Sequence, residues 1–468
     1  MKLAAIWLLS LTAAGQTSLV DAIQADSLRG RISFLASDLL EGRDTPSRGL
    51  DIAAEYIASE FRRAGLDGPP GFFQFADFIA IRNRAEGLQL VLSGAGETRS
   101  VGAEGLEVRA VRGLHLENQP VFKWAPGVKM PPSVAGHVLV LRRPSDSSTL
   151  AALELARPDA IVELSRRLDP EPERDVRLEP GKDPDSRATP VVMAREGELE
   201  SVFDRLPNGA GSGRVTLHVP DPLITPARVK NVIGILRGSD SRLRNQALVI
   251  SAHYDHLGLT QGADPIYNGA NDNASGVAGV IELAHAFAQR AHPKRTLIFV
   301  AFFGEEKGLL GSAYYVAHPL VALSDTIADI NFEQIGRPNR DDGLPPGQMG
   351  VTGYELSNLA SSIASDAGSA GVKIDDTKHN EEYFARSDNY SFAKAGIPAQ
   401  TFVAAYEYPD YHQVTDSWEK LDYGNMATLL RAIALGILDL ADREAVPHWN
   451  ETNPAAKSYW TAWRALHK

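Results

Sequence analysis

The chain has 468 residues, of which 44% are hydrophobic and 23% charged, and its formal net charge is −12. These values are typical of a globular protein with one large or two ordinary domains, and the negative charge argues against nucleic acid and anionic membranes as partners. Cysteine is absent, which excludes disulfides and thiolate-bound zinc, so any metal must be held by His, Asp and Glu.

The N-terminal segment MKLAAIWLLSLTAAGQTS has the pattern of a secretory signal peptide. Lys2 supplies a positive charge, the following apolar stretch is too short to span a bilayer, and Ala13 and Gly15 are small enough for cleavage. We predict a signal peptide over residues 1–15, with a buried first helix or a lipid-free anchor as the alternative. No later segment approaches about 18 uninterrupted apolar residues, so we expect a mature chain without a membrane span. Such a chain, lacking cysteine, fits a secreted or periplasmic bacterial protein.

Residues 23–96 are predicted to begin the main domain with two helices. In the second, apolar residues recur at helical spacing from Ile52 to Phe61, and Gly65 follows as a C-terminal stop. Residues 97–225 differ in character, because short strand patterns such as GHVLVLRRP and GRVTLHV alternate with loops rich in proline and charge. We predict an inserted, smaller β-rich (α+β) domain over this region.

From residue 226 onward, strand patterns alternate with helical ones. NVIGIL, ALVISA, TLIFVAFF, ADINFEQI and AQTFVA are typical of buried strands, and ASGVAGVIELAHAFAQR is typical of a helix with one apolar face. This alternation predicts an α/β fold with a mostly parallel twisted sheet covered by helices on both faces. The main domain is therefore expected to be discontinuous, over residues 23–96 and 226–445, with a C-terminal tail over 446–468.

Polar side chains follow most of these predicted strands. In an open α/β sheet, ligands bind outside the carboxyl ends of the strands, so such residues are expected at one edge. They are His253 and Asp255 after ALVISA, Asp272 before the long helix, Glu305 and Glu306 after TLIFVAFF, Glu333 after ADINF, and Tyr411, His412 and Asp416 after AQTFVA.

Two imidazoles and several carboxylates without a thiol suit zinc or a similar divalent ion. The set is larger than one tetrahedral zinc needs, but it suits two metals that share a bridging carboxylate. Such a site also explains the adjacent carboxylates Glu305 and Glu306, which would otherwise repel each other. One would bind metal while the other takes a proton from an attacking water, and the cations would cancel the repulsion.

The motifs SAHYDHLG, GANDNASGVA, FFGEEKGLLGS, NFEQIGR, RSDNYSF and YHQVTD resemble, in order, those of the co-catalytic zinc aminopeptidases, metallopeptidase family 28. The resemblance extends from about residue 229 to 440. The segment FLASDLLEGRDTPSRGLDIAAEYIASEFRRAGL also resembles the leading helices of that family, and the inserted region resembles a protease-associated domain.

The resemblance implies a set of metal ligands. One zinc would be held by His253 and Glu333 and the other by Glu306 and His412, with Asp272 bridging the two. The family usually has Asp where this chain has Glu333, which keeps the ligand oxygens but adds a methylene group.

The same resemblance implies the remaining roles. Glu305 would be the general base, Tyr411 would stabilise the oxyanion, and Arg386 would contact substrate. Asp255 and Asp416 would each orient the ligand histidine nearest to it in the sequence.

Two alternative assignments remain open at this point. His256 shares a turn with His253 and is a second candidate ligand, although the resemblance assigns the metal to His253. The segment GANDNASG is also typical of a helix N-cap, so Asp272 is a candidate cap for the long helix.

The motifs together predict a secreted metal-dependent exopeptidase with two zinc ions, most simply an aminopeptidase that hydrolyses N-terminal amino acids from peptides. A carboxypeptidase or dipeptidase on the same fold is an alternative, with Arg386 as the candidate for binding a substrate carboxylate. A single-zinc glutaminyl cyclase and a non-catalytic binding module are further alternatives. The five ligands argue against the cyclase, and their retention beside Glu305 argues against a decayed site.

Overall fold

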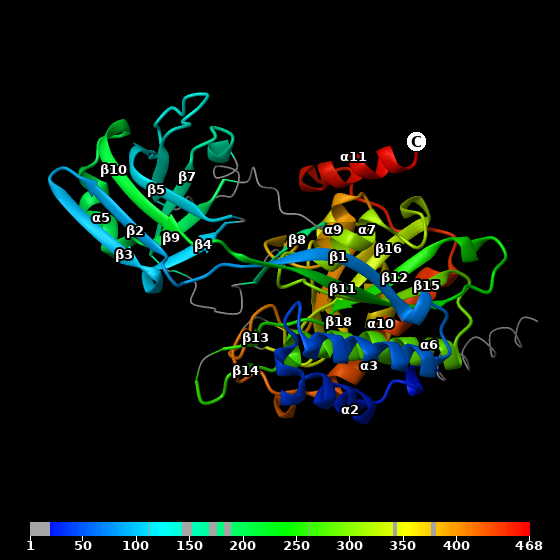
Figure 1. Ribbon diagram of the computed structural model, residues 1–468. Helices are drawn as coiled ribbons and strands as arrows, with labels where there is room; N and C mark the ends of the chain where they lie inside the picture. Colours follow the sequence, from blue (N-terminus) through cyan, green and yellow to red (C-terminus); the bar gives the residue numbers. More distant parts are fainter. Residues whose placement is uncertain are drawn as a thin grey trace, which may run out of the picture. The chain divides into compact units, whose positions relative to one another are not determined.

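The computed structural model describes residues 19–110, 112–142, 152–166, 168, 176–181, 189–260, 262–339, 344–375 and 381–468. The signal peptide predicted at residues 1–15 lies outside this part of the chain. The chain divides into two compact units, both drawn in Figure 1. Unit 1 comprises the residues up to Ala76 together with Arg228–Lys468, and unit 2 comprises Asp77–Ala227.

A twisted sheet runs through unit 1, and its four central strands are parallel. Every residue of these strands is buried, as expected where helices cover both faces. In spatial order the strands are β19 (Ala399–Val403), β16 (Thr326–Phe332), β12 (Ala247–His253) and β15 (Thr296–Phe302). The predicted parallel arrangement is therefore confirmed at the centre of the sheet.

The sheet becomes antiparallel beyond these four strands. β17 pairs antiparallel with β19, and β11 pairs antiparallel with β15, whereas β18 pairs parallel with β17. These outer strands are β11 (Leu223–Leu236), β17 (Gln348–Val351) and β18 (Lys373–Asp375). An apolar strand has the same pattern in either direction, so the sequence carries no signal for the change.

Helices lie on both faces of the unit 1 sheet. α6 packs against β12, β15 and β16, whereas α7 contacts β15, and α9 contacts β16 and β19. Figure 1 shows α7, α9 and α11 on one side of these strands and α3, α6 and α10 on the other. The helices are α2 (Ala25–Leu35), η1 (Asp38–Arg43), α3 (Arg48–Ala64), α6 (Gly276–Arg290), α7 (Leu310–Ala317), α8 (Leu359–Ser369), α9 (Asn389–Lys394), α10 (Tyr423–Asp442) and α11 (Lys457–Leu466). This layering confirms the α/β class.

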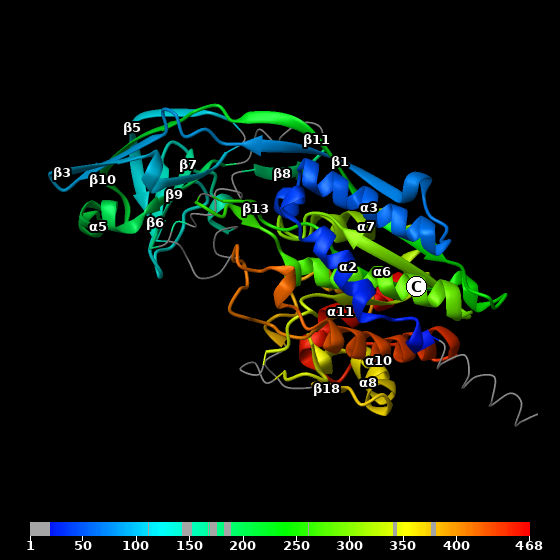
Figure 2. The ribbon, with the colours of Figure 1, turned by 90° about the horizontal axis from the view of Figure 1, so that it is seen from below.

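α10 is apolar enough, with a mean hydropathy of 1.3 in its best window, to cross a membrane by length and composition. However, 67% of that window is buried within the protein. The helix packs against α2, α6 and α8, and Figure 2 shows it alongside α8 and α2 in the helical layer of unit 1. Packing inside unit 1 accounts for its apolar character.

The predicted C-terminal tail packs onto unit 1. Trp449 is only 3% exposed, and its indole Nε1 donates a hydrogen bond to the carbonyl oxygen of Gly396 at 2.7 Å. Gly396 has φ 97°, and a Cβ atom there would lie 2.3 Å from the backbone nitrogen of Trp463 on α11. The tail therefore belongs to the helical layer that contains α9.

Unit 2 is built on an eight-stranded sheet and the helix α5 (Glu196–Arg205). In spatial order its strands are β3 (Glu97–Gly102), β2 (Gln89–Gly94), β10 (Gly209–Val219), β5 (Leu114–Lys123), β6 (Val138–Arg142), β7 (Ala160–Ser165), β9 (Val191–Arg195) and β4 (Leu106–Arg109). β1 (Phe73–Arg82) pairs antiparallel with β8 (Val176–Pro180). The unit begins at Asp77, ahead of the boundary predicted at residue 97, and includes β2, which pairs with β3 and β10.

Candidate metal centre

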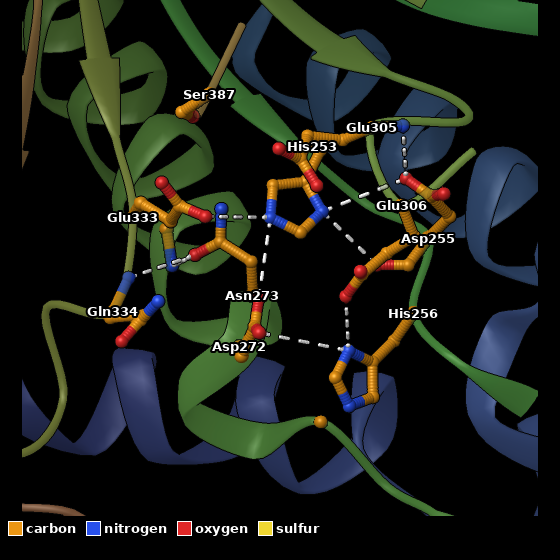
Figure 3. A network of polar contacts seen from close by, with 12 residues as sticks. His253, Asp255, His256, Asp272, Asn273, Glu305, Glu306, Glu333, Gln334 and Ser387 are labelled. Carbon is orange, nitrogen blue, oxygen red and sulfur yellow. Dashed lines mark hydrogen bonds and ion pairs between the residues drawn. The ribbon is translucent and has the colours of Figure 1, made fainter. Parts of the chain in front are cut away.

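Parallel strands bring the first predicted ligands together at one edge of the unit 1 sheet. His253 is the last residue of β12, and Glu333 directly follows the neighbouring strand β16. The Nε2 atom of His253 lies 3.5 Å from Glu333 Oε1 and 3.3 Å from Asp272 Oδ1 (Figure 3). These three ligand atoms all lie within 4.8 Å of one another.

This first group fits a divalent metal. His253 Nε2 and Asp272 Oδ1 are both buried, and neither has a hydrogen-bond partner among the described residues. Leaving buried polar atoms unpaired costs about 1–3 kcal/mol each, so such a pair calls for a partner. Two ligands bound to one zinc at about 2.0–2.2 Å lie roughly 3–3.5 Å apart, which matches the observed separations.

A second group forms around the other oxygen of Asp272. Oδ2 of Asp272 lies 3.2 Å from His412 Nε2, and Glu306 Oε1 lies 3.5 Å from the same nitrogen. His256 also joins this group, with its Nδ1 atom 2.9 Å from Glu306 Oε1 (Figure 3). Because its two oxygens face different groups, Asp272 is placed as a bridging ligand would be.

Two histidines keep the Asp272 carboxylate anionic, and Asp416 holds its backbone in position. Burial alone would raise the pKa of Asp272, but contacts with His253 and His412 hold that pKa well below its usual range. Oδ2 of Asp416 accepts hydrogen bonds from the backbone N–H groups of Asn271 (2.9 Å) and Asp272 (3.1 Å). We expected Asp416 to orient His412, but its carboxylate instead holds the backbone of the segment that carries Asp272.

The asparagines that flank Asp272 connect it to the segment after β16. Oδ1 of Asn271 accepts a hydrogen bond from the backbone N–H of Gly336 at 2.7 Å. Nδ2 of Asn273 donates to the carbonyl oxygen of Phe332 at 2.9 Å, one residue before Glu333, and its Oδ1 accepts the backbone N–H of Gln334 at 3.3 Å (Figure 3). The motif Asn-Asp-Asn therefore sets one ligand relative to another, beyond any helix-capping role.

Asp255 supports two site residues at once. Its carbonyl oxygen lies 3.2 Å from His253 Nδ1 and can accept that N–H, which leaves Nε2 free to face Asp272. Its carboxylate Oδ1 lies 3.6 Å from the same Nδ1 and accepts the backbone N–H of Glu305 at 3.2 Å. Oδ2 accepts the hydroxyl of Thr45 at 3.1 Å.

Glu305 and Glu306 have pKa values shifted in opposite directions. Burial raises the pKa of Glu305 well above its usual range, with Glu333 and Glu306 adding to the rise and His253 opposing it. Burial and Asp272 also tend to raise the pKa of Glu306, but contacts with His256 and His412 outweigh them and lower it. In the metal-free protein, Glu305 therefore holds a proton more readily than Glu306.

Tyr411 and Arg386 also lie near the ligands. The ring of Tyr411 stacks on His412, with centroids 4.0 Å apart. Burial raises the pKa of Tyr411, with Asp272 and Glu306 adding to the rise and Arg386 opposing it, so its hydroxyl stays a donor. Arg386 is exposed.

The segment between α2 and α3 also reaches the site. The buried guanidinium of Arg43 donates to the carbonyl oxygens of Tyr254 (2.9 Å), Asn268 (2.8 Å) and Gly269 (2.9 Å). Burial lowers the pKa of Arg43 to about 10, so it remains a cation at neutral pH. It ties the segment after β12 to the segment before Asp272, and a lone arginine between two helices gives no signal of such partners.

Asp410 anchors the segment that carries His412. Its Oδ1 accepts hydrogen bonds from the Thr415 hydroxyl (2.5 Å) and Lys420 Nζ (2.9 Å), and its Oδ2 pairs with Arg337. Burial would raise the pKa of Asp410, but these donors outweigh it and lower the pKa to about 2. The anchor therefore persists at any pH at which the site could bind metal.

Replacing Asp410 by Asn should lower the free energy of unfolding of the metal-free protein by about 2 kcal/mol at pH 7. Because the folded-state pKa lies below the unfolded one, this stabilisation is complete above about pH 5 and is lost as pH falls through 2. The difference between wild type and variant should therefore shrink to about half near pH 3. Urea unfolding at both pH values checks this, with the exposed Asp264→Asn as control; a constant difference would contradict the ionic anchor.

Comparisons with known proteins agree with this geometry. Residues 231–436 match the profile of a family described as "Peptidase family M28". A protein named "Probable zinc metalloprotease" from Pyrenophora teres f. teres (strain 0-1) is 29% identical over 245 residues, which cover 48% of this chain and 51% of the relative. The "Probable lipoprotein aminopeptidase LpqL" of Mycobacterium tuberculosis (strain ATCC 25618 / H37Rv) is 27% identical over 253 residues, 47% of this chain and 48% of the relative.

The fold also matches a solved structure. An aminopeptidase from Aneurinibacillus sp. strain AM-1 superposes with a TM-score of 0.66 at 19% identity, covering 92% of this chain and 97% of the other. The chain spans about half of the length of the two curated relatives named above. The structural likeness thus extends over both units, whereas the sequence likeness is concentrated in part of the chain.

Proposed function

We propose that the protein, whose residues 231–436 match the profile of peptidase family M28, is an aminopeptidase that removes N-terminal residues from peptides at a two-zinc site. One observation carries the proposal: two ligand groups share Asp272, and Glu305 lies beside them without belonging to either. This arrangement supplies metal ligands and a separate proton acceptor, which are the parts that metal-assisted hydrolysis requires.

The side chains would divide the reaction between them. Zinc ions held by the two groups would supply Lewis-acid polarisation of the scissile carbonyl and activation of a water. Glu305 takes the proton of the attacking water and passes it to the leaving amine. The hydroxyl of Tyr411 donates a hydrogen bond to the oxyanion that develops on the carbonyl. Asp255 orients the imidazole of His253 and holds the backbone of Glu305, so it fixes the position of a metal ligand and of the general base relative to each other.

A carboxypeptidase or dipeptidase is the second candidate, and Arg386 is the observation that favours it. The charge of Arg386 tends to lower the pKa of Tyr411, whose ring stacks on His412, and its guanidinium lies 5.0 Å from the ring centroid of Tyr383. The side chain is exposed, however, and an exposed arginine is a weak anchor for a carboxylate. A single-zinc cyclase would leave one of the two ligand groups without a role.

We also propose that the protein acts outside the cytoplasm, secreted or in the periplasm. The signal-like segment at residues 1–15 and the lipoprotein aminopeptidase named among the relatives support this location. Terminal sequencing of the protein recovered from the medium or periplasm should show a new N-terminus near residue 16. Recovery of uncleaved chain in the cytoplasm alone would contradict it.

A free α-amino group should be required for cleavage. A panel of aminoacyl p-nitroanilides should be hydrolysed at least about 100-fold faster than their N-acetylated counterparts, because burying an acetylated amine leaves its binding groups unpaired. Cleavage rates of peptides with blocked and with free C-termini show whether a free carboxylate is needed. Repeating each assay with a chelator shows whether the cleavage depends on metal. Equal cleavage of acetylated substrates would remove the aminopeptidase proposal, and a strict need for a free C-terminus would favour the carboxypeptidase.

A further inference from the structure

Asp44 and Lys307 form an ion pair to which the proposed function gives no role. Oδ1 of Asp44 lies 3.0 Å from Nζ of Lys307, and the two side chains are only 19% and 8% exposed. Asp44 directly follows η1, and Lys307 is two residues after Glu305, the general base of the proposed reaction. The pair therefore joins the segment between α2 and α3 to the segment that carries the base.

The backbone of Glu305 is held from both sides. Its N–H donates to Oδ1 of Asp255 at 3.2 Å (Figure 3). Its carbonyl oxygen accepts the N–H groups of Gly308 at 2.9 Å and Leu309 at 3.0 Å. These bonds close a turn in which Lys307 is one of the two central residues, so the position of Lys307 fixes how the turn is oriented.

Asp44 and its neighbour Thr45 reach both of these supports. The fully buried Thr45 donates its hydroxyl to Oδ2 of Asp255 at 3.1 Å, and the other carboxylate oxygen of Asp255 holds the N–H of Glu305. Asp44 pairs with Lys307 in the turn that follows. Two adjacent residues thus hold Glu305 through different partners, one before it and one after it in the sequence.

The stability of the fold does not account for the pair. Burial raises the pKa of Asp44 from 3.8 to about 6, although Lys307 opposes the rise. A folded-state pKa above the unfolded one gives a stabilising contribution that is complete below about pH 4 and is lost as pH rises through about 6. At pH 7 Asp44 is ionised and the pair is present, but keeping that charge buried lowers the stability of the fold.

We propose that Asp44 and Lys307 are positioning residues that hold the turn after Glu305, so that its carboxylate is aimed at the attacking water. The inference rests on the proposed function and deepens it, because the pair acts through the general base. Neither side chain belongs to a ligand group, so zinc binding should not depend on the pair. A displacement of about 1 Å at a reacting group can cost about 100-fold in rate, which is the effect that the pair prevents.

The test replaces the pair by neutral side chains in the zinc-loaded, full-length protein. We expect Asp44→Asn/Lys307→Met to lower kcat about 10–100-fold, while KM and the zinc content stay within about twofold of wild type. Exchanging a buried ion pair for neutral residues is often neutral or stabilising, so the unfolding temperature should not fall. Lys307→Arg keeps a charged donor opposite Asp44 and should retain most of kcat. Asp51→Asn/Lys230→Met removes another Asp–Lys pair of unit 1, at 2.8 Å, and is the matched control.

A second comparison separates positioning from a structural role. In a Glu305→Gln background, removing the pair should cost no further activity, because its effect passes through a carboxylate that is already lost. If the double variant does not fold, Lys307→Met alone serves in its place, since Asp44 can then neutralise its charge by taking up a proton. Unchanged kcat without the pair, or the same loss with and without Glu305, would overturn the inference and leave the pair as a structural contact. Full activity in Glu305→Gln alone would instead overturn the proposed role of Glu305, on which the inference rests.

Discussion

Glu305→Gln should lower kcat by roughly 10²–10⁴-fold while the protein keeps its full zinc content. The amide keeps the size of the carboxylate but cannot accept a proton from water. Glu305 belongs to neither ligand group, and its backbone contact with Asp255 does not use the side chain, so metal and substrate binding should change little. Steady-state kinetics and metal analysis on the same preparation check both halves of this expectation.

Glu306→Gln is the matched comparison, because it makes the same chemical change one residue away. Oε1 of Glu306 contacts both His256 and His412, so its amide should lose the second zinc first and activity as a consequence. Added zinc should restore part of the rate to this variant and none to the Glu305 variant. Loss of metal from Glu305→Gln with full retention in Glu306→Gln would mean that the two roles are reversed.

Asp272→Ala should abolish activity to at least roughly 10⁴ below wild type and reduce bound zinc from two ions to one or fewer. Each oxygen of Asp272 faces a different ligand group, so its removal takes one ligand from both. In the wild type we expect the ions about 3.5–4 Å apart, the usual spacing of two-metal sites. Metal analysis after dialysis, with Asp264→Ala as control, measures the loss.

The stability of the same variant provides an independent readout. Zinc that binds only the folded protein raises its unfolding temperature, so wild type should show a large zinc-dependent increase and Asp272→Ala a small one. Without metal, the variant should be less stable than wild type, because it removes the buried carboxylate that pairs with His253 and His412. Two retained zinc ions in Asp272→Ala would contradict the bridging role and favour separate sites.

The pattern of buried strands and the chemistry that follows them were readable from the sequence. β12 and β15 are nearly continuous apolar runs, as expected of strands buried on both faces, whereas β16 and β19 also contain buried polar residues such as Asp329 and Gln400. Parallel strands align their carboxyl ends at one edge of the sheet. Residue type and position after the strands predicted a cluster of polar side chains, and the resemblance to the zinc aminopeptidases singled out His253, Asp272, Glu306, Glu333 and His412 as its metal ligands. The sequence did not predict where unit 2 begins. β2 has the pattern of any short strand, and only its pairing with β3 and β10 assigns it to unit 2.

Only the tertiary structure decided which neighbouring groups act on those ligands. Asp416 bonds to the backbone N–H of Asn271, which is 145 residues away in the sequence, and Arg43 bonds to the carbonyl of Gly269, 226 residues away. A local sequence pattern carries no information about contacts between residues so far apart. His256 follows the strand end by three residues, where the chain has left the regular alternation of side chains, so its direction depends on packing. A buried polar group must find its partner wherever the fold places one. The sequence therefore determines what chemistry is present, and the packing of distant segments decides how it is arranged.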